Sequence, residues 1–150
     1  MAIFDNLLLA IDLSHDSDRL LSRVLKICQG DMEQVNVVHV LRSDFHDIPL
    51  RSESSDDPPL DIDQRRRRDQ ALLKLNTILR KNGFNVASHQ IHIKAGEPAT
   101  EIKRLAHDLE ADLVIVGSHS KRGGGWLDLP GSTTNCVLQG IDADVMAVRV

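Results

Sequence analysis

The chain has 150 residues, of which 41% are hydrophobic and 27% charged, a composition that excludes a disordered protein and suits one soluble globular domain. Its net charge of −4 argues against nucleic acid as a partner, because a nucleic-acid binder needs a basic surface. No apolar stretch approaches the ~20 residues that span a membrane, and no signal-peptide core is present, so we expect neither a membrane protein nor a secreted one. Cys28 and Cys136 lie far apart without metal-ligand spacing, which fits inert thiols in a reducing cytoplasm.

Strand-like and helix-like patterns alternate along the sequence. Continuous apolar runs predict buried strands at residues 7–11, 35–41, 113–116 and 144–150, and a looser alternation predicts another at 86–94. Apolar residues at helical spacing predict helices over 20–28, 71–79 and 99–109, and a shorter one opening at 131. The expected helix boundaries are an N-cap at Asp16 or Ser17, a stop at Gly30, an end near Asn82-Gly83 and a start at Glu97-Pro98.

A polar connection, about residues 42–63, separates the second strand from the second helix. A loop of this length is unusual inside a compact domain, so we expect it to be mobile or functional within a single domain spanning 1–150. The basic run Arg65 to Arg68 opens the following helix, beneath the acidic segment Glu53 to Asp57. A solvated helix face tied to that segment is favoured over an anion-binding or partner-binding patch.

The alternation of strands and helices predicts an α/β fold, a three-layer sandwich in which helices cover both faces of a five-stranded parallel sheet. If the chain winds outward through its first three strands and then returns, the strand order is 3-2-1-4-5. Ligands bind such sheets at the carboxyl ends of the strands, in the crevice where the winding reverses between strands 1 and 4. Asp12 and Gly117 end these two strands, so both are expected at the crevice.

The stretch after the fourth strand has the residues of an anion or phosphate site. The strand ends on Gly117-Ser118-His119-Ser120, three glycines follow at 123–125, and Gly131-Ser132-Thr133 opens a short helix. A helix N-terminus offers free N–H groups, hydroxyls and the positive end of a dipole. The spacing matches neither a P-loop, since no Lys-Ser or Lys-Thr pair follows Gly131, nor the Gly-x-Gly-x-x-Gly of dinucleotide binders. Trp126, in the same loop, either covers the site or docks the loop on the core.

Individual side chains near these elements have more than one interpretation. Asp12 either accepts hydrogen bonds from an adenine or ribose edge or caps the turn into the first helix. His39, between two valines of a strand, is interpreted as a packed, hydrogen-bonded histidine. His119 has no identifiable nucleophile or orienting partner in its loop, so no catalytic residue is expected. His89 and His92 would lie on opposite faces of one strand and form no ligand pair.

Five short motifs occur in a specific order and spacing. They are Ile11-Asp12-Leu13-Ser14, His39-Val40, Gly96-Glu97-Pro98, the run from Asp112 to His119, and Gly131-Ser132 before a closing apolar strand. In this arrangement the chain resembles the universal stress protein family along nearly its whole length. The resemblance implies the adenine nucleotide alpha hydrolase-like fold with strand order 3-2-1-4-5. It also implies a role in stress response and a homodimer joined through the last strand, residues 144–150.

Nucleotide-binding members of that family carry Gly, two residues, Gly, nine residues, Gly, then Ser or Thr. The resemblance assigns adenine contacts to Asp12 and Val40, the start of the phosphate loop to Val116, Gly117, Ser118, His119 and Ser120, and phosphate contacts to Gly131, Ser132 and Thr133. This chain departs twice, since Ser120 replaces the second glycine and ten residues separate it from Gly131. If position 120 requires a positive φ, serine costs roughly 1–2 kcal/mol there, which weakens binding about five- to thirty-fold.

Three functional hypotheses follow. The first is a regulatory module that binds ATP or a related adenine nucleotide, with Mg²⁺ considered because the loop supplies little positive charge beyond Lys121 and Arg122. The second is a homodimer that acts through protein contacts without nucleotide, which Ser120 and the longer loop favour. An enzyme ranks last, with at most slow ATP hydrolysis, because the His-x-Gly-His and Ser-Gly-Gly-x-Asp-Ser motifs of related hydrolases and transferases are absent.

Overall fold

A computed structural model of the chain describes residues 4–13, 16–42, 62–118 and 139–149, and these form a five-stranded parallel sheet of order β3-β2-β1-β4-β5. The strands are β1 (Leu7–Ala10), β2 (Val35–Leu41), β3 (Ile91–Ala95), β4 (Leu113–Ser118) and β5 (Asp144–Arg149). All four pairings are parallel, and β1 lies between β2 and β4. The strand order predicted from the sequence is therefore confirmed.

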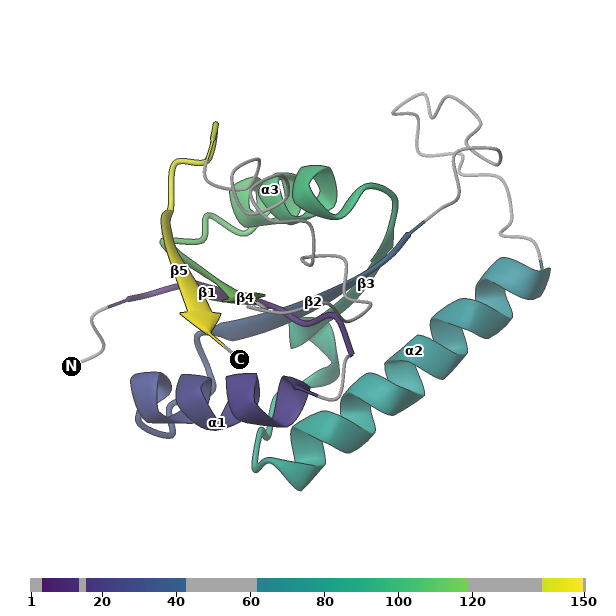
Figure 1. The fold of residues 1–150 in the computed structure, drawn as a ribbon, viewed down its shortest axis with the longest axis horizontal. Coiled ribbons are helices and arrows are strands. Elements are labelled where there is room, and N and C mark those ends of the chain that lie inside the picture. The colour runs from purple at the N-terminus through teal and green to yellow at the C-terminus, as the bar shows by residue number, and fades with distance from the viewer. Residues whose placement is uncertain (1–3, 14–15, 43–61, 119–138, 150) are drawn as a thin grey trace.

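Helices cover both faces of this sheet (Figure 1). The helices α1 (Ser17–Cys28) and α2 (Ile62–Lys81) lie on one face, and α3 (Pro98–Asp108) lies on the other. A short 3-10 turn, η1 (Ser88–Gln90), precedes β3. The α/β three-layer architecture is confirmed for the described residues.

The core consists of two apolar clusters, one on each face of the sheet. Under α1 and α2, alternate strand residues such as Leu9, Val37 and Ile115 pack with residues of both helices. Under α3, the intervening strand residues, such as Leu8 and Val114, pack with the inner face of that helix. Because the central strands are buried on both faces, their sequences read as unbroken apolar runs. Each fully buried aliphatic side chain of this kind stabilises the fold by about 1.5–3 kcal/mol.

The ends of α2 and α3 follow from local sequence. At the end of α2, Gly83 adopts a φ of 79°, its N–H donates to the Arg80 carbonyl, and the Phe84 N–H donates to the Leu79 carbonyl. This pair of bonds is a Schellman motif, which needs a residue without a Cβ at its left-handed position. At the start of α3, the Glu97 carboxylate accepts the Thr100 N–H at 2.8 Å. Both boundaries are confirmed at the residues that predicted them.

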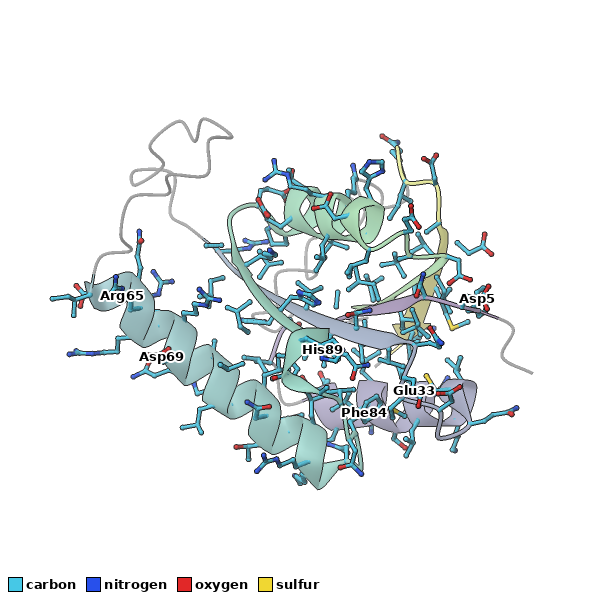
Figure 2. All side chains as sticks on the ribbon, turned by 180° about the vertical axis from the view of Figure 1, so that it is seen from behind. Asp5, Glu33, Arg65, Asp69, Phe84 and His89 are labelled. Atoms are coloured by element: carbon cyan, nitrogen blue, oxygen red, sulfur yellow. The ribbon has the colours of Figure 1, made fainter. Side chains whose placement is uncertain are left out.

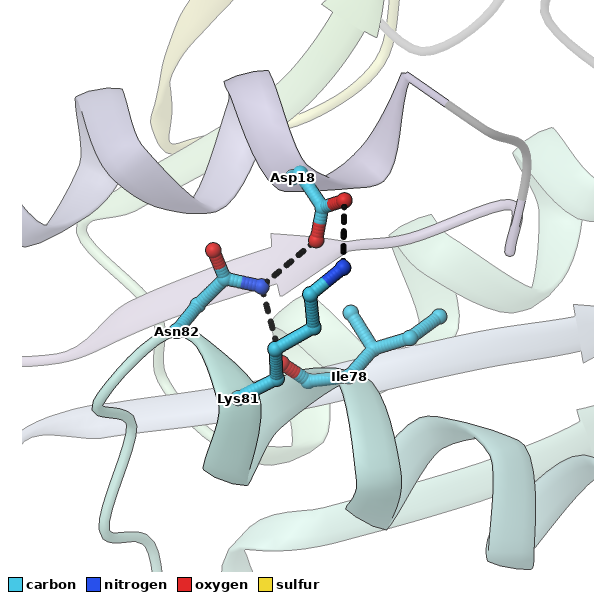
Figure 3. Close-up of polar contacts among 4 residues, drawn as sticks. All are labelled: Asp18, Ile78, Lys81 and Asn82. Atoms are coloured by element: carbon cyan, nitrogen blue, oxygen red, sulfur yellow. Dashed lines mark hydrogen bonds and ion pairs between the residues drawn. The ribbon is translucent and has the colours of Figure 1, made fainter.

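A polar cluster joins the first turn of α1 to the last turn of α2 (Figure 3). The Asp18 carboxylate accepts hydrogen bonds from Asn82 Nδ2 at 2.8 Å and from Lys81 Nζ at 3.2 Å. Asn82 Nδ2 also donates to the Ile78 carbonyl at 2.9 Å. Hydrogen bonds from Asn82 and Lys81 hold the pKa of Asp18 below its ordinary value. The cluster links the two helices on this face at the surface.

The prediction of a strand beginning at residue 86 is wrong, because β3 begins at Ile91. The reason is Gln90, a buried side chain that serves the backbone of its neighbours. Its Oε1 accepts the Ala87 N–H at 2.7 Å, and its Nε2 donates to the Met32 and Val35 carbonyls at 2.7 Å each. These bonds close the turn η1 and tie it to the start of β2. The prediction that His89 and His92 share one strand is wrong for the same reason, since His89 lies in η1 and His92 in β3.

The amino-terminal half of α2 extends beyond the sheet (Figure 1), and every residue from 62 to 70 is exposed. Arg65 and Asp69 project from this half of the helix (Figure 2). Ile62 and Leu73, at 74% and 70% exposure, share its outward face. The four arginines are therefore exposed to solvent, and the acidic segment to which the sequence analysis ties them lies outside the described residues. The polar connection lies almost wholly in 43–61, outside the described residues.

At the amino edge of the sheet, Asp112 ties β1 to β4. Its two carboxylate oxygens accept the backbone N–H groups of Asp5 at 2.7 Å and of Asn6 at 2.8 Å. The Asn6 side chain donates in turn to the Glu110 carbonyl at 3.3 Å. The two strands that flank the reversal of winding are thus held together at this end, and the opposite end carries the candidate site.

Candidate functional site

At the carboxyl edge of the sheet, the central strand ends before its neighbours. Ala10, the last residue of β1, pairs with Val38 of β2 and Val116 of β4. From these partners β2 continues to Leu41 and β4 continues to Ser118. The residues that follow β1 are therefore flanked on both sides by strands that extend past it. This is the point where the winding reverses, the place at which open α/β sheets bind ligands.

Asp12 lies in this position, half-buried, two residues beyond the end of β1. Extending the register of the strands places it level with Val40 on one side and Ser118 on the other. The next residue, Leu13, has a φ of 59°, in the left-handed region that a leucine rarely adopts. The backbone therefore leaves the extended conformation of the strand at Leu13, immediately after Asp12.

Val40 and Val116 present backbone groups, and not their side chains, at this edge of the sheet. Their side chains are 1% and 0% exposed and pack in the cluster under α3. The Val38 carbonyl points to β1, where it accepts the Ile11 N–H at 2.9 Å. In a strand the backbone groups two residues on point the same way, so the Val40 N–H and C=O face the space beyond the end of β1. Val40 can thus offer a donor and an acceptor beside Asp12.

His39 is buried, 7% exposed, and its ring contacts Ile11, the residue before Asp12. Nδ1 lies 2.6 Å from the Ile11 carbonyl oxygen. Burial lowers the pKa of His39, while the bond to Ile11 and the charge of Asp12 act in the opposite direction. The interpretation of His39 as a packed, hydrogen-bonded histidine is confirmed, and the structure adds its partner.

Arg42 is a cation at the same edge that the sequence analysis did not single out. Its carbonyl accepts a hydrogen bond from Arg67 Nη2 at 3.4 Å, which ties the end of β2 to α2. Burial would raise the pKa of Glu97, but hydrogen bonds from Thr100 and Ala99 and the charge of Arg42 outweigh it and lower that pKa. Arg42 therefore lies within electrostatic reach of the first turn of α3. In the sequence, only the position of Arg42 two residues after Val40 indicates that it lies at this edge.

Of the predicted site residues, the structure brings Asp12, Val40, Val116, Gly117 and Ser118 to one edge of the sheet. Gly117 is buried and pairs with Val148 of β5. The remaining predicted residues lie outside the described residues: His119, Ser120, Gly131, Ser132 and Thr133.

The last strand, β5, forms one edge of the sheet beside β4. Ala147 and Arg149 are exposed, whereas Val148 is 5% exposed and packs in the cluster under α1 and α2. A charge at Val148 would therefore disrupt the core of one subunit, and Ala147 is the better position at which to probe this edge. Within the described residues, no helix is long and apolar enough to span a membrane.

Comparison with known proteins decides the family. The model of the universal stress protein family matches residues 4–149. The chain belongs to the universal stress protein family. It is 28% identical to universal stress protein A homolog 1 of Coxiella burnetii, over 97% of this chain and 96% of that protein.

Solved structures of the family share the fold. A universal stress protein from Archaeoglobus fulgidus matches with a TM-score of 0.64 at 19% identity, covering 97% of this chain and 99% of its own. A second structure from that organism, in complex with dAMP, has a TM-score of 0.58 at 18% identity and covers 97% and 98% of the two chains. A universal stress protein in complex with cAMP has a TM-score of 0.61 at 18% identity, covering 97% of each chain. The adenine nucleotide alpha hydrolase-like fold is thereby established for this universal stress protein.

Proposed function

We propose that this universal stress protein is a single-domain regulatory module that binds an adenine nucleotide at the carboxyl edge of its sheet. The observation that carries the proposal is the early end of β1, which leaves Asp12 and the Val40 backbone side by side at the reversal of winding. Two structural relatives, solved with cAMP and with dAMP, support an adenine nucleotide as the ligand class.

The chemistry of the edge suits an adenine ring. A base offers an amino donor beside ring-nitrogen acceptors, which a carboxylate and a backbone N–H can each match. In our proposal Asp12 and Val40 meet the base. Residues Val116 to Ser120 begin the phosphate loop, and Gly131, Ser132 and Thr133 bind the phosphates. ATP is the nucleotide we favour, and Mg²⁺ would neutralise phosphate charge that Lys121 and Arg122 leave.

Isothermal titration calorimetry with ATP, ADP and AMP tests the ligand. Replacing Asp12 with alanine removes a hydrogen bond to a charged group, worth about 1.5–3 kcal/mol, so affinity should fall roughly ten- to hundredfold. Asp5→Ala is the matched control, because Asp5 is exposed at the opposite edge of the sheet. Equal affinities in the two variants would exclude Asp12 from the site.

Two glycine positions test the phosphate loop. Gly131→Val adds a branched side chain where backbone must approach phosphate, and should remove binding while thermal unfolding stays as in the wild type. Ser120→Gly should tighten binding about five- to thirty-fold if that residue has a positive φ. Native mass spectrometry of the purified protein gives an independent answer, since a bound nucleotide adds its own mass.

A second candidate function is a homodimer that acts through protein contacts without nucleotide. Two observations favour it, the serine at position 120 and the exposed edge of β5. Edge strands expose unpaired backbone groups, and a second copy of the same strand is one way to cover them. The absence of heat and of a thermal shift at millimolar nucleotide would make this candidate the better one.

A further inference from the structure

The Ile11 carbonyl marks the place where β1 stops following β2. The Ile11 N–H still donates to the Val38 carbonyl at 2.9 Å, as in a parallel ladder. The carbonyl of the same residue is held by the ring of His39, with Nδ1 2.6 Å away. Because a carbonyl oxygen can only accept, Nδ1 must carry the proton of this hydrogen bond. The neutral ring therefore has its acceptor nitrogen at Nε2.

The His39 ring lies on the face of the sheet opposite the one that carries the Val40 side chain. Val37 packs in the cluster under α1 and α2, while Val38 and Val40 pack under α3. Side chains alternate along a strand, so His39 lies on the same face as Val37. The contact that joins His39 to the residues before Asp12 is its hydrogen bond to the Ile11 carbonyl.

Asp12 is fixed on its other side as well. Leu13 keeps a φ of 59° while its side chain packs against the core under α1 and α2. A left-handed leucine is unfavourable and persists only where its surroundings hold it. Asp12 thus lies between a carbonyl that His39 holds and a turn that Leu13 locks. The charge of Asp12 acts on the His39 ring and favours its protonated form, against the effect of burial on the His39 pKa.

We propose that His39 is a positioning residue for nucleotide binding, whose Nδ1–H holds the Ile11 carbonyl and so presents the Asp12 carboxylate beside the Val40 backbone. The inference rests on the proposed function and names a residue that acts on the ligand through Asp12. A carboxylate held in place before the ligand arrives loses less conformational entropy on binding, which raises affinity.

Two substitutions at one position separate this role from general support of the fold. In His39→Asn, the side-chain Nδ2 lies the same number of bonds from the backbone as the histidine Nδ1, so it can donate to the Ile11 carbonyl. In His39→Leu the donor is lost and the position stays apolar. His92→Leu is the matched control, since His92 is a half-buried histidine of the next strand, 3.2 Å from Asn36 Oδ1.

Calorimetric affinity for AMP and ATP, and the amide chemical shifts of Asp12 and Leu13 by NMR, are the two measurements. We expect His39→Leu to weaken binding about tenfold or more and to move both amide shifts. His39→Asn should bind within about threefold of the wild type, and His92→Leu should bind as the wild type does.

Wild-type affinity in His39→Leu would overturn this inference alone, as would an asparagine variant as weak as the leucine variant. A parallel loss in His92→Leu would reveal a general effect of sheet stability and equally overturn it. If the wild type binds no nucleotide, the proposed function fails, and the positioning role fails with it.

Discussion

Replacing Gln90 with leucine is a stringent test of how the fold is held together. The side chain makes three hydrogen bonds at 2.7 Å, one to Ala87 and two to the carbonyls of Met32 and Val35. At a net value of about 1 kcal/mol each they contribute ~3 kcal/mol. The Val35 carbonyl and the Ala87 N–H then face an apolar side chain, which adds roughly 1–3 kcal/mol, and the buried leucine recovers part of it. The Met32 carbonyl still accepts the Val35 N–H at 3.2 Å. The expected loss is about 3–4 kcal/mol.

That loss is a large part of the 5–15 kcal/mol by which a domain of about this size is stable. The melting temperature should fall by roughly 6–16 °C, measured by calorimetry and checked by urea unfolding. Gln70→Leu is the control, because Gln70 is exposed on α2 and its replacement should stay within about 0.5 kcal/mol. Gln90→Glu should lose more than Gln90→Leu at neutral pH, since it places a negative charge against two carbonyls. A Gln90→Leu variant within about 1 kcal/mol of the wild type would refute the reasoning.

Three further predictions concern pH and assembly. Asp18 has a lowered pKa, so its contribution to stability is present above its unfolded pKa and lost as pH falls through the folded one. Urea unfolding should show the wild type more stable than Asp18→Asn at pH 7 and the gap closing below about pH 4; a constant gap would contradict this. Burial lowers the pKa of His39, so the neutral ring is the stable form and stability falls as pH drops below about 6.5. Between pH 7.5 and 5 the melting temperature of His39→Asn should fall less than that of the wild type. Equal falls in the two proteins would contradict this prediction. If β5 joins two copies, Ala147→Glu should give monomers in sedimentation velocity and a melting temperature that no longer depends on protein concentration, whereas a monomeric wild type would dismiss the dimer.

The sequence predicted the sheet well because burial on both faces leaves a strong signal. The runs at 7–11, 35–41 and 113–116 contain almost no polar residue, and each became a strand in the predicted order. The start of β3 was not predictable in this way. Gln90 looks like one polar residue in an alternating stretch, yet its partners Met32 and Val35 lie more than fifty residues away. The first nine residues of α2, 62–70, are all exposed, so apolar spacing carries no information about them.

The sequence predicted where Asp12 and Gly117 lie, but not how the edge around them is built. Asp12 and Gly117 follow apolar runs directly, so topology alone places them at one edge. That Val40 presents its backbone, and that His39 holds the carbonyl before Asp12, depends on where β1 stops relative to β2. Past the level of Ala10, β2 continues for three residues and β4 for two, and such differences are below what sequence patterns define.

The central position of β1 has a consequence for how the chain folds as it is made. Asn6 and Asp112, which join the amino ends of β1 and β4, are 106 residues apart in the sequence. Until the ribosome has added β4, one edge of the apolar strand Leu7–Ala10 has no partner from its own chain. Such long-range pairing slows folding, and an uncovered apolar strand attracts other chains. We therefore expect nascent chains arrested before residue 112 to depend on chaperones, and those arrested after β4 has emerged to depend on them much less.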